Sequence, residues 1–312
     1  MESPQLRPIG IGEILDVGFK IYTRNALTLL KIGLVVVVPI QILAGLVLLG
    51  TVDDPGLVGF SPELGDASDS EVAGAVAGNV ISTLLGAAAV LLVTVGCVKA
   101  VGDAYLGKQP DWRESLAFAR GRFGAVLWLT VLTGLLLILT LAPILTFPVT
   151  IWLYVAWSVA YPVLLLEGVR GRKALGRSFR LVRRRWWPTF ATLLVASVLA
   201  AIVGFVVGVP LGIALIFAQD SVLAAVLVTT VIGAISGVVA TPFQAAVTTL
   251  IYFDLRVRKE GLDMQLLAQD IGAPVPEGFQ LGQEPPPPAT PVPGPEAPPP
   301  PPGSPQPSAG AP

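Results

Sequence analysis

Histidine is absent from this chain, and cysteine occurs only once, at Cys97. Without histidine there is no imidazole base, no imidazole metal ligand and no Ser-His or Cys-His nucleophile pair. A lone cysteine also excludes a disulfide within the chain. Its neighbours include Val and Gly, so we interpret Cys97 as a small apolar packing residue. The sequence predicts no catalytic residue, cofactor-binding residue or metal ligand, although chemistry based on carboxylates stays open.

Charged residues are scarce as well. They make up 13% of the chain, whereas a soluble domain has about 25%. Apolar residues make up 53%, and the mean hydropathy is +0.74. The N-terminus does not resemble a secretory signal peptide, because its long apolar run starts near Ala26, after Glu13 and Asp16. We therefore expect an integral membrane protein that retains its first span.

Six apolar segments are long enough to cross a bilayer, which requires about 20 residues. They cover residues 26–50, 75–98, 123–146, 148–166, 188–217 and 222–253. The turns at 142–148 and 218–221 are short, so the third and fourth spans, and the fifth and sixth, should form antiparallel hairpins. Prolines inside the spans are tolerated where neighbouring helices compensate for the lost hydrogen bonds.

Basic residues are missing between residues 51 and 74, where six Asp and Glu residues lie. When successive spans alternate in direction, all 20 Lys and Arg residues fall on the side of the membrane opposite to this acidic loop. Cytoplasmic loops collect Lys and Arg during insertion, so the sequence predicts that both termini are cytoplasmic. Ala, Gly, Val and Pro are abundant, and Arg outnumbers Lys. This bias is typical of a GC-rich bacterial genome and therefore favours a location in a bacterial cytoplasmic membrane.

Small residues recur at four-residue spacing along three of the spans. Such lines allow helix backbones to approach closely, so we interpret them as packing seams, with a gating hinge as the alternative. They are Gly74, Gly78, Ser82 and Gly86, then Gly204, Gly208 and Gly212, then Gly233, Gly237 and Thr241.

Three basic segments resemble one another, and each directly precedes a span. They read GFKIYTRN from Gly18, SLAFARGR from Ser115 and SFRLVRRR from Ser178. Apolar residues recur in each at spacings of 4, 3 and 4, which is typical of an amphipathic helix. We interpret the chain as three pseudo-repeated hairpins with cytoplasmic amphipathic interfacial helices.

The third of these segments carries the most positive charge, with eight Lys and Arg residues between Arg170 and Arg185. Orientation alone needs only a few charges per loop. A basic amphipathic helix with aromatic residues at its edge lies in the headgroup plane and prefers anionic lipid. The candidate anionic-lipid contacts are Arg172, Arg177, Arg180, Arg183, Arg184 and Trp186.

A carboxylate stands where each even-numbered span reaches the cytoplasm, namely Asp103, Glu167 and Asp254. The first interpretation is an ion pair with the neighbouring Lys99, Arg170 or Arg256 that orients the elbow into the next helix. The alternative is a ring of sites for a cation or a lipid headgroup at the cytoplasmic mouth. No charge falls near the bilayer midplane, where ion-coupled pumps normally carry an ionisable residue.

The chain ends in two further segments. Residues 254–273 follow the last span with a basic closing sequence and are expected to include a short cytoplasmic surface helix. Residues 274–312 are rich in proline and cannot bury a core, so the sequence predicts a disordered tail. A docking peptide for a protein partner with an aromatic groove is the alternative.

Three stretches resemble a known family. They are LRPIGIGEILDVGFKIYTRN, EGVRGRKALGRSFRLVRRRWW and TPFQAAVTTLIYFDLRVRKEGLDMQLLA. They are similar to bacterial, especially actinobacterial, integral membrane proteins related to the membrane domain of glycerophosphoryl diester phosphodiesterases. These 312 residues, with no histidine, are not expected to include the catalytic domain of those enzymes. The resemblance therefore implies a membrane fold over about residues 5–270 and transfers no catalytic residue.

The sequence thus predicts an all-α polytopic membrane protein of six transmembrane helices, preceded by a cytoplasmic segment over residues 1–25. Its expected role is that of a non-enzymatic accessory or organising protein that contacts anionic membrane lipids, with no nucleic-acid partner. The alternative is a transporter or lipid-translocating protein that uses a cleft between the repeats. An enzyme is the third hypothesis, because it would need clustered polar residues at one membrane face.

Overall fold

A computed structural model describes residues 10–54, 57–58, 68–141, 147–216 and 221–262. Over these ranges the secondary structure is helical and contains no strand. Six helices are long and apolar enough to cross a membrane. They are Ala26–Thr51, Asp69–Tyr105, Trp112–Thr140, Phe147–Leu166, Arg172–Ala214 and Val222–Glu260. The prediction of an all-α polytopic fold is confirmed, and the chain is a multi-pass membrane protein.

The helices follow one another with few interruptions. In chain order they are α1 (Ile11–Arg24), α2 (Ala26–Thr51), α3 (Asp69–Tyr105), α4 (Trp112–Leu141), α5 (Phe147–Trp157), α6 (Ala160–Leu166), α7 (Arg172–Val182), the 3-10 turn η3 (Arg183–Arg185), α8 (Trp186–Ile216) and α9 (Val222–Glu260). The fourth predicted span is therefore divided into α5 and α6. The helix of the last predicted span continues as α9 to Glu260, so the first residues of the expected segment 254–273 belong to the same helix.

The three predicted interfacial segments enter their spans in different ways. α1 is separated from α2 at Asn25, whose side-chain amide donates to the Ile21 carbonyl at 3.0 Å. α7 is separated from α8 by η3, and Pro188 explains that break because it cannot donate to the Arg184 carbonyl four residues earlier. The second segment is not a separate helix, because α4 runs through it without an interruption.

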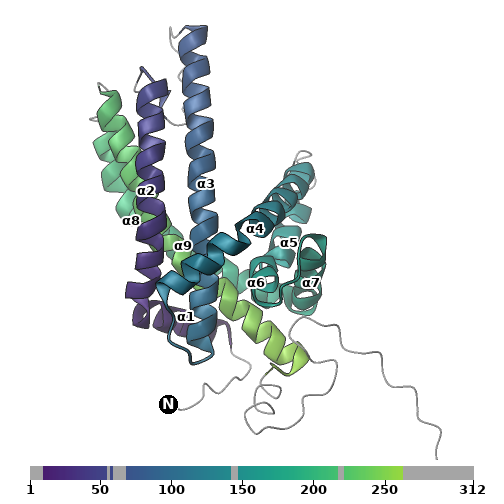
Figure 1. Cartoon of the computed structure of the whole chain (residues 1–312). Coiled ribbons are helices and arrows are strands. Elements are labelled where there is room, and N and C mark those ends of the chain that lie inside the picture. The colour runs from purple at the N-terminus through teal and green to yellow at the C-terminus, as the bar shows by residue number, and fades with distance from the viewer. Residues whose placement is uncertain (1–9, 55–56, 59–67, 142–146, 217–220, 263–312) are drawn as a thin grey trace, which may run out of the picture.

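The core lies in the half of the molecule that holds α1 and the C-terminal parts of α3 and α9. Its fully buried side chains include Leu29, Ile32, Val98 and Leu250. In Figure 1, α2 and α3 run side by side, while α4 leans away from α3 toward its C-terminal end. Large apolar side chains are exposed on α4 and α8, such as Leu139 and Phe205, each at 71%. Lipid can cover such surface in a membrane protein.

Close backbone contact joins α2 to α9. A Cβ atom built on Gly33 would stand 3.1 Å from the Cα of Val238, and one built on Gly237 would stand 3.1 Å from a methyl carbon of Val37. The seam predicted on α9 is thus confirmed at Gly237. The line of Gly204, Gly208 and Gly212 is different, because among the described residues nothing lies within 4 Å of such a Cβ. The prediction of a packing seam within the chain is wrong for that line.

Several predicted segments lie outside the described residues. They are residues 1–9, most of the acidic loop, the turn at 142–146, residues 217–220 with most of the turn at 218–221, and the chain beyond residue 262. The proline-rich tail at 274–312 is among them, so its predicted disorder and its docking role stay predictions.

Candidate anionic-lipid interface

α7 carries the basic segment and has two different faces. Ala174, Leu175, Ser178 and Leu181 are buried on one of them. The Ser178 hydroxyl donates to the Ala156 carbonyl at 2.8 Å and thereby ties α7 to α5. The helix starts after Gly171, whose φ of 58° belongs to the left-handed region that glycine adopts readily. Packing of the apolar face turns the other face of α7 outward.

Four of the predicted lipid contacts are exposed, two on α7 and two on η3, which follows it. Arg172, Arg180, Arg183 and Arg184 are exposed. None of their guanidinium groups forms an ion pair with a carboxylate in the part of the chain that the structure describes. Their charge is therefore available to an external anion.

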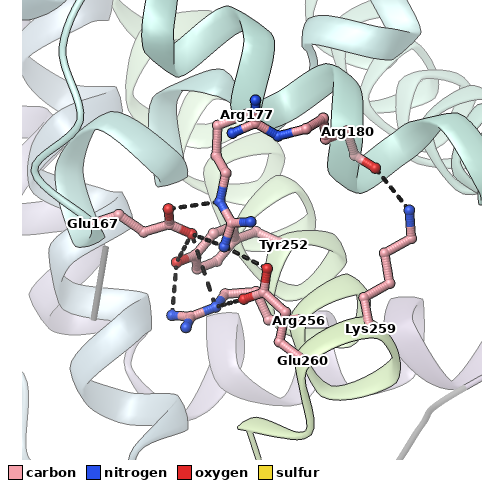
Figure 2. Close-up of polar contacts among 7 residues, drawn as sticks. All are labelled: Glu167, Arg177, Arg180, Tyr252, Arg256, Lys259 and Glu260. Carbon is pink, nitrogen blue, oxygen red and sulfur yellow. Dashed lines mark hydrogen bonds and ion pairs between the residues drawn. The ribbon is translucent and has the colours of Figure 1, made fainter. Parts of the chain in front are cut away.

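Arg177 is turned inward and does not belong to this set. Its Nε atom lies 2.9 Å from Glu167 Oε2, and its Nη2 atom lies 2.5 Å from Glu260 Oε1. Figure 2 shows its guanidinium between the two carboxylates. The prediction that Arg177 contacts lipid is corrected, because the group is already engaged by two negative charges.

Glu167 occupies the centre of a buried polar network. Its side chain is 1% exposed and accepts a hydrogen bond of 3.1 Å from the Tyr252 hydroxyl. Arg256 donates to that hydroxyl at 3.2 Å and to Glu260 at 2.9 Å (Figure 2). Two Glu and two Arg residues balance each other's charge. The network, defined by Glu167, Arg177, Tyr252, Arg256 and Glu260, joins the end of α6 to α7 and α9.

Asp103 and Asp254, the other two carboxylates predicted at the cytoplasmic ends of spans, also have basic partners. Asp103 pairs with Lys99 on the same helix, and Lys99 also lies 3.1 Å from Glu114 on α4. Asp254 pairs with Arg258 one turn later at 2.9 Å. All three carboxylates form ion pairs, as the first interpretation predicts. Asp103 uses the predicted partner Lys99, whereas Glu167 pairs with Arg177 and Asp254 pairs with Arg258, two partners that were not predicted. Ion pairing gives no support to a ring of cation sites.

Aromatic side chains surround the start of α8. The Trp186 indole donates to the Trp152 carbonyl at 3.2 Å, and its ring stacks on Phe190 with centroids 5.2 Å apart. Trp186 is therefore half-buried and supports the elbow from inside. The neighbouring Trp187 is 73% exposed. Because tryptophan prefers the membrane interface, Trp187 replaces Trp186 as the aromatic residue best placed to contact lipid.

Lys259 was missed by sequence reasoning. Its Nζ donates to the Arg180 carbonyl at 2.7 Å, across 79 residues of sequence (Figure 2). In the sequence Lys259 only closes the last span, and no local pattern links it to α7. We define the basic cluster as Arg180, Arg183, Arg184 and Lys259.

A small pocket lies between α1, α8 and α9. It is lined by Ile14, Arg185, Thr189 and Asp254, among others, and its volume is about 20 Å³. That volume accommodates one water molecule, for which roughly 10–15 Å³ suffices. The pocket has no room for an organic substrate.

Comparison with known proteins gives one result. A family model described as "Domain of unknown function (DUF8558)" matches residues 118–281, slightly more than half of the chain. The chain belongs to this family. The DUF8558 region contains α7, the buried network and the whole basic cluster. No curated protein and no solved structure was found to match the chain.

Proposed function

We propose that this DUF8558 protein is a non-enzymatic accessory or organising protein that binds anionic lipid at the elbow between α7 and α8. The observation that carries the proposal is the set of exposed guanidinium groups on that elbow. Arg172, Arg180, Arg183 and Arg184 have no carboxylate partner among the described residues, and Trp187 is exposed beside them. An exposed basic surface with an adjacent aromatic ring suits a phosphate-bearing headgroup.

The proposed location is the cytoplasmic leaflet of a bacterial cytoplasmic membrane, with both termini cytoplasmic. The sorting of all 20 Lys and Arg residues to one side supports this orientation. That leaflet presents anionic lipids, and each Lys or Arg near its surface contributes about 1 kcal/mol of attraction. The relation to the phosphodiesterase membrane domain stays a prediction from the three resembling stretches.

Native mass spectrometry of the purified full chain tests this proposal. We expect preferential retention of a phosphatidylglycerol over a phosphatidylcholine with the same acyl chains. The variant Arg180→Ala/Arg183→Ala/Arg184→Ala should reduce that preference at least tenfold, since about 1 kcal/mol is lost per charge. Equal retention of the two lipids by the unaltered protein contradicts the proposal.

A matched control comes from the second basic segment. Arg113 and Arg122 lie over the rings of Trp112 and Phe118, at 5.1 and 5.0 Å from the ring centroids. The variant Arg113→Ala/Arg120→Ala/Arg122→Ala removes the same number of charges from the same predicted membrane side. If both triple variants lose the preference equally, general surface charge explains it and the elbow has no special role.

The transport alternative receives less support. It needs a cleft between the repeats that reaches the bilayer midplane. Instead, α2 and α9 pack closely at Gly33 and Gly237, and the pocket beside α8 has room for one water. These features favour a packed membrane domain over a translocation path.

A further inference from the structure

The basic cluster is assembled from two distant segments. Arg180, Arg183 and Arg184 come from α7 and η3, and Lys259 comes from the last turn of α9. Figure 2 shows the Lys259 side chain reaching from α9 to the Arg180 carbonyl, while the Arg180 guanidinium points in the other direction along α7. Folding thus adds a fourth cation to a surface that already carries three.

Bringing like charges together costs free energy unless an anion compensates them. At physiological ionic strength their repulsion extends over about 8 Å. Glu260 directly follows Lys259 in the chain, but its carboxylate forms ion pairs with Arg177 and Arg256. Glu167, the other acid of the network, is likewise engaged by Arg177 and Tyr252. The four cations therefore exceed the negative charge that the described residues place beside them.

Lys259 also has a simpler structural use. The C-terminal end of a helix has a partial negative charge, and a lysine that donates to a last-turn carbonyl stabilises it. Its bond to the Arg180 carbonyl fulfils that role. Capping a carbonyl needs only a hydrogen-bond donor, so capping alone does not require a charge at this position.

We propose that the basic cluster binds a lipid headgroup that carries two phosphates. This inference rests on the proposed binding of anionic lipid. A headgroup with a single phosphodiester brings one negative charge, whereas two linked phosphates bring twice the charge to the same four cations. Guanidinium groups suit such a site, because each can donate two parallel hydrogen bonds to phosphate oxygens.

The surroundings of the cluster indicate a lipid as the source of the phosphates. Trp187 follows η3 directly and is 73% exposed. On α8, Leu194, Val198 and Ile202 continue on the same helical face and are 51%, 50% and 54% exposed. Acyl chains can lie along this apolar face while the phosphates contact the cluster. A soluble diphosphate would leave the face unused.

Native mass spectrometry of the full chain in detergent tests the inference with three probes of matched acyl length. They are cardiolipin, phosphatidylglycerol and phosphatidylcholine. Phosphatidylglycerol is added at twice the molar amount of cardiolipin, so that the two anionic lipids bring the same total charge. We expect cardiolipin to be retained several-fold better than the charge-matched phosphatidylglycerol. Equal retention of these two anionic lipids overturns the inference, while the preference over phosphatidylcholine separately tests the proposed function.

Three variants separate charge from capping. Lys259→Gln, which retains a hydrogen-bond donor, should lower cardiolipin retention about fivefold, as expected for about 1 kcal/mol per charge. Lys259→Arg should retain cardiolipin like the unaltered protein. The control Lys108→Gln removes one charge from the exposed connection between α3 and α4 and should change little. If Lys259→Gln behaves like Lys108→Gln, Lys259 only caps α7 and the inference fails.

A competition arm distinguishes a lipid from a free phosphate. Inorganic pyrophosphate, at the same concentration as cardiolipin, should not displace cardiolipin from the unaltered protein. Displacement would show that the site holds free diphosphate as well as it holds the lipid, which contradicts the proposed acyl contacts. Equal helical circular dichroism of all variants in the same detergent verifies that they are folded.

Discussion

Arg177 on α7 and Glu260 at the end of α9 form an ion pair in which Nη2 and Oε1 are 2.5 Å apart. This pair fixes the basic helix to the helix that supplies Lys259. The side chains are 19% and 22% exposed, so the bond lies at the edge of the buried network. α7 is thus held by carboxylates on its inner side, while its outer guanidiniums remain exposed to the surroundings.

Glu167→Gln should strongly destabilise the protein. The Glu167 side chain is 1% exposed, and its charge opposes Arg177 and Arg256. Removing one partner of a buried pair leaves an uncompensated charge and typically costs about 3–5 kcal/mol. Thermal unfolding in detergent should show a clear drop in Tm.

The control for this variant is Asp16→Asn. Asp16 pairs with Lys20 on α1, where the side chains are 56% and 66% exposed. Exposed pairs of this kind contribute roughly 0–1 kcal/mol, so Tm should hardly change. A similar Tm for the Glu167 and Asp16 variants would mean that the network does not stabilise the fold.

A double-mutant cycle on Arg177→Ala and Glu260→Ala should reveal coupling between α7 and α9. Residues in one ion-pair network usually show coupling free energies of about 0.5–3 kcal/mol. We expect the double variant to unfold at a denaturant concentration closer to that of Arg177→Ala than additivity predicts. Strictly additive changes would show that the two side chains act independently.

The buried network also shows how far the sequence can predict the candidate site. Glu167 and Arg177 were both identified from the sequence, but as members of separate sets with separate roles. Their pairing depends on the turn between α6 and α7, which places residues ten positions apart side by side. Tyr252 and Lys259 come from α9, and their contacts span 85 and 79 residues. Local periodicity and charge counts hold no information on such contacts.

The fold itself was more accessible, because hydropathy and length determine which segments can cross a bilayer. The line of Gly204, Gly208 and Gly212 was misinterpreted for a physical reason. A row of small residues permits close packing, but the position of a neighbouring helix decides whether packing occurs. α9 approaches α2 at Gly237, while nothing in the described part of the chain approaches the α8 glycines.

Gly33→Leu should be destabilising, whereas Gly208→Leu should be tolerated. At Gly33 a Cβ would already stand 3.1 Å from the Val238 backbone, so a leucine must push α2 and α9 apart. Overpacking of this kind costs about 1–3 kcal/mol. At Gly208 the space is open, and leucine has a higher helix propensity than glycine. Comparison of the two Tm values checks the prediction, and equal values contradict the close contact.

The predicted orientation can be tested with single cysteines in a Cys97→Ala background, since Cys97 is fully buried. Asp53→Cys lies between α2 and α3, and Lys108→Cys lies between α3 and α4; both positions are exposed. A membrane-impermeant maleimide added to intact cells should label the cysteine at position 53 and leave the one at position 108 unlabelled. Permeabilised cells should show labelling at both positions. The reverse pattern in intact cells would place the basic cluster outside the cytoplasm, where the abundance of anionic lipid could not explain its charge.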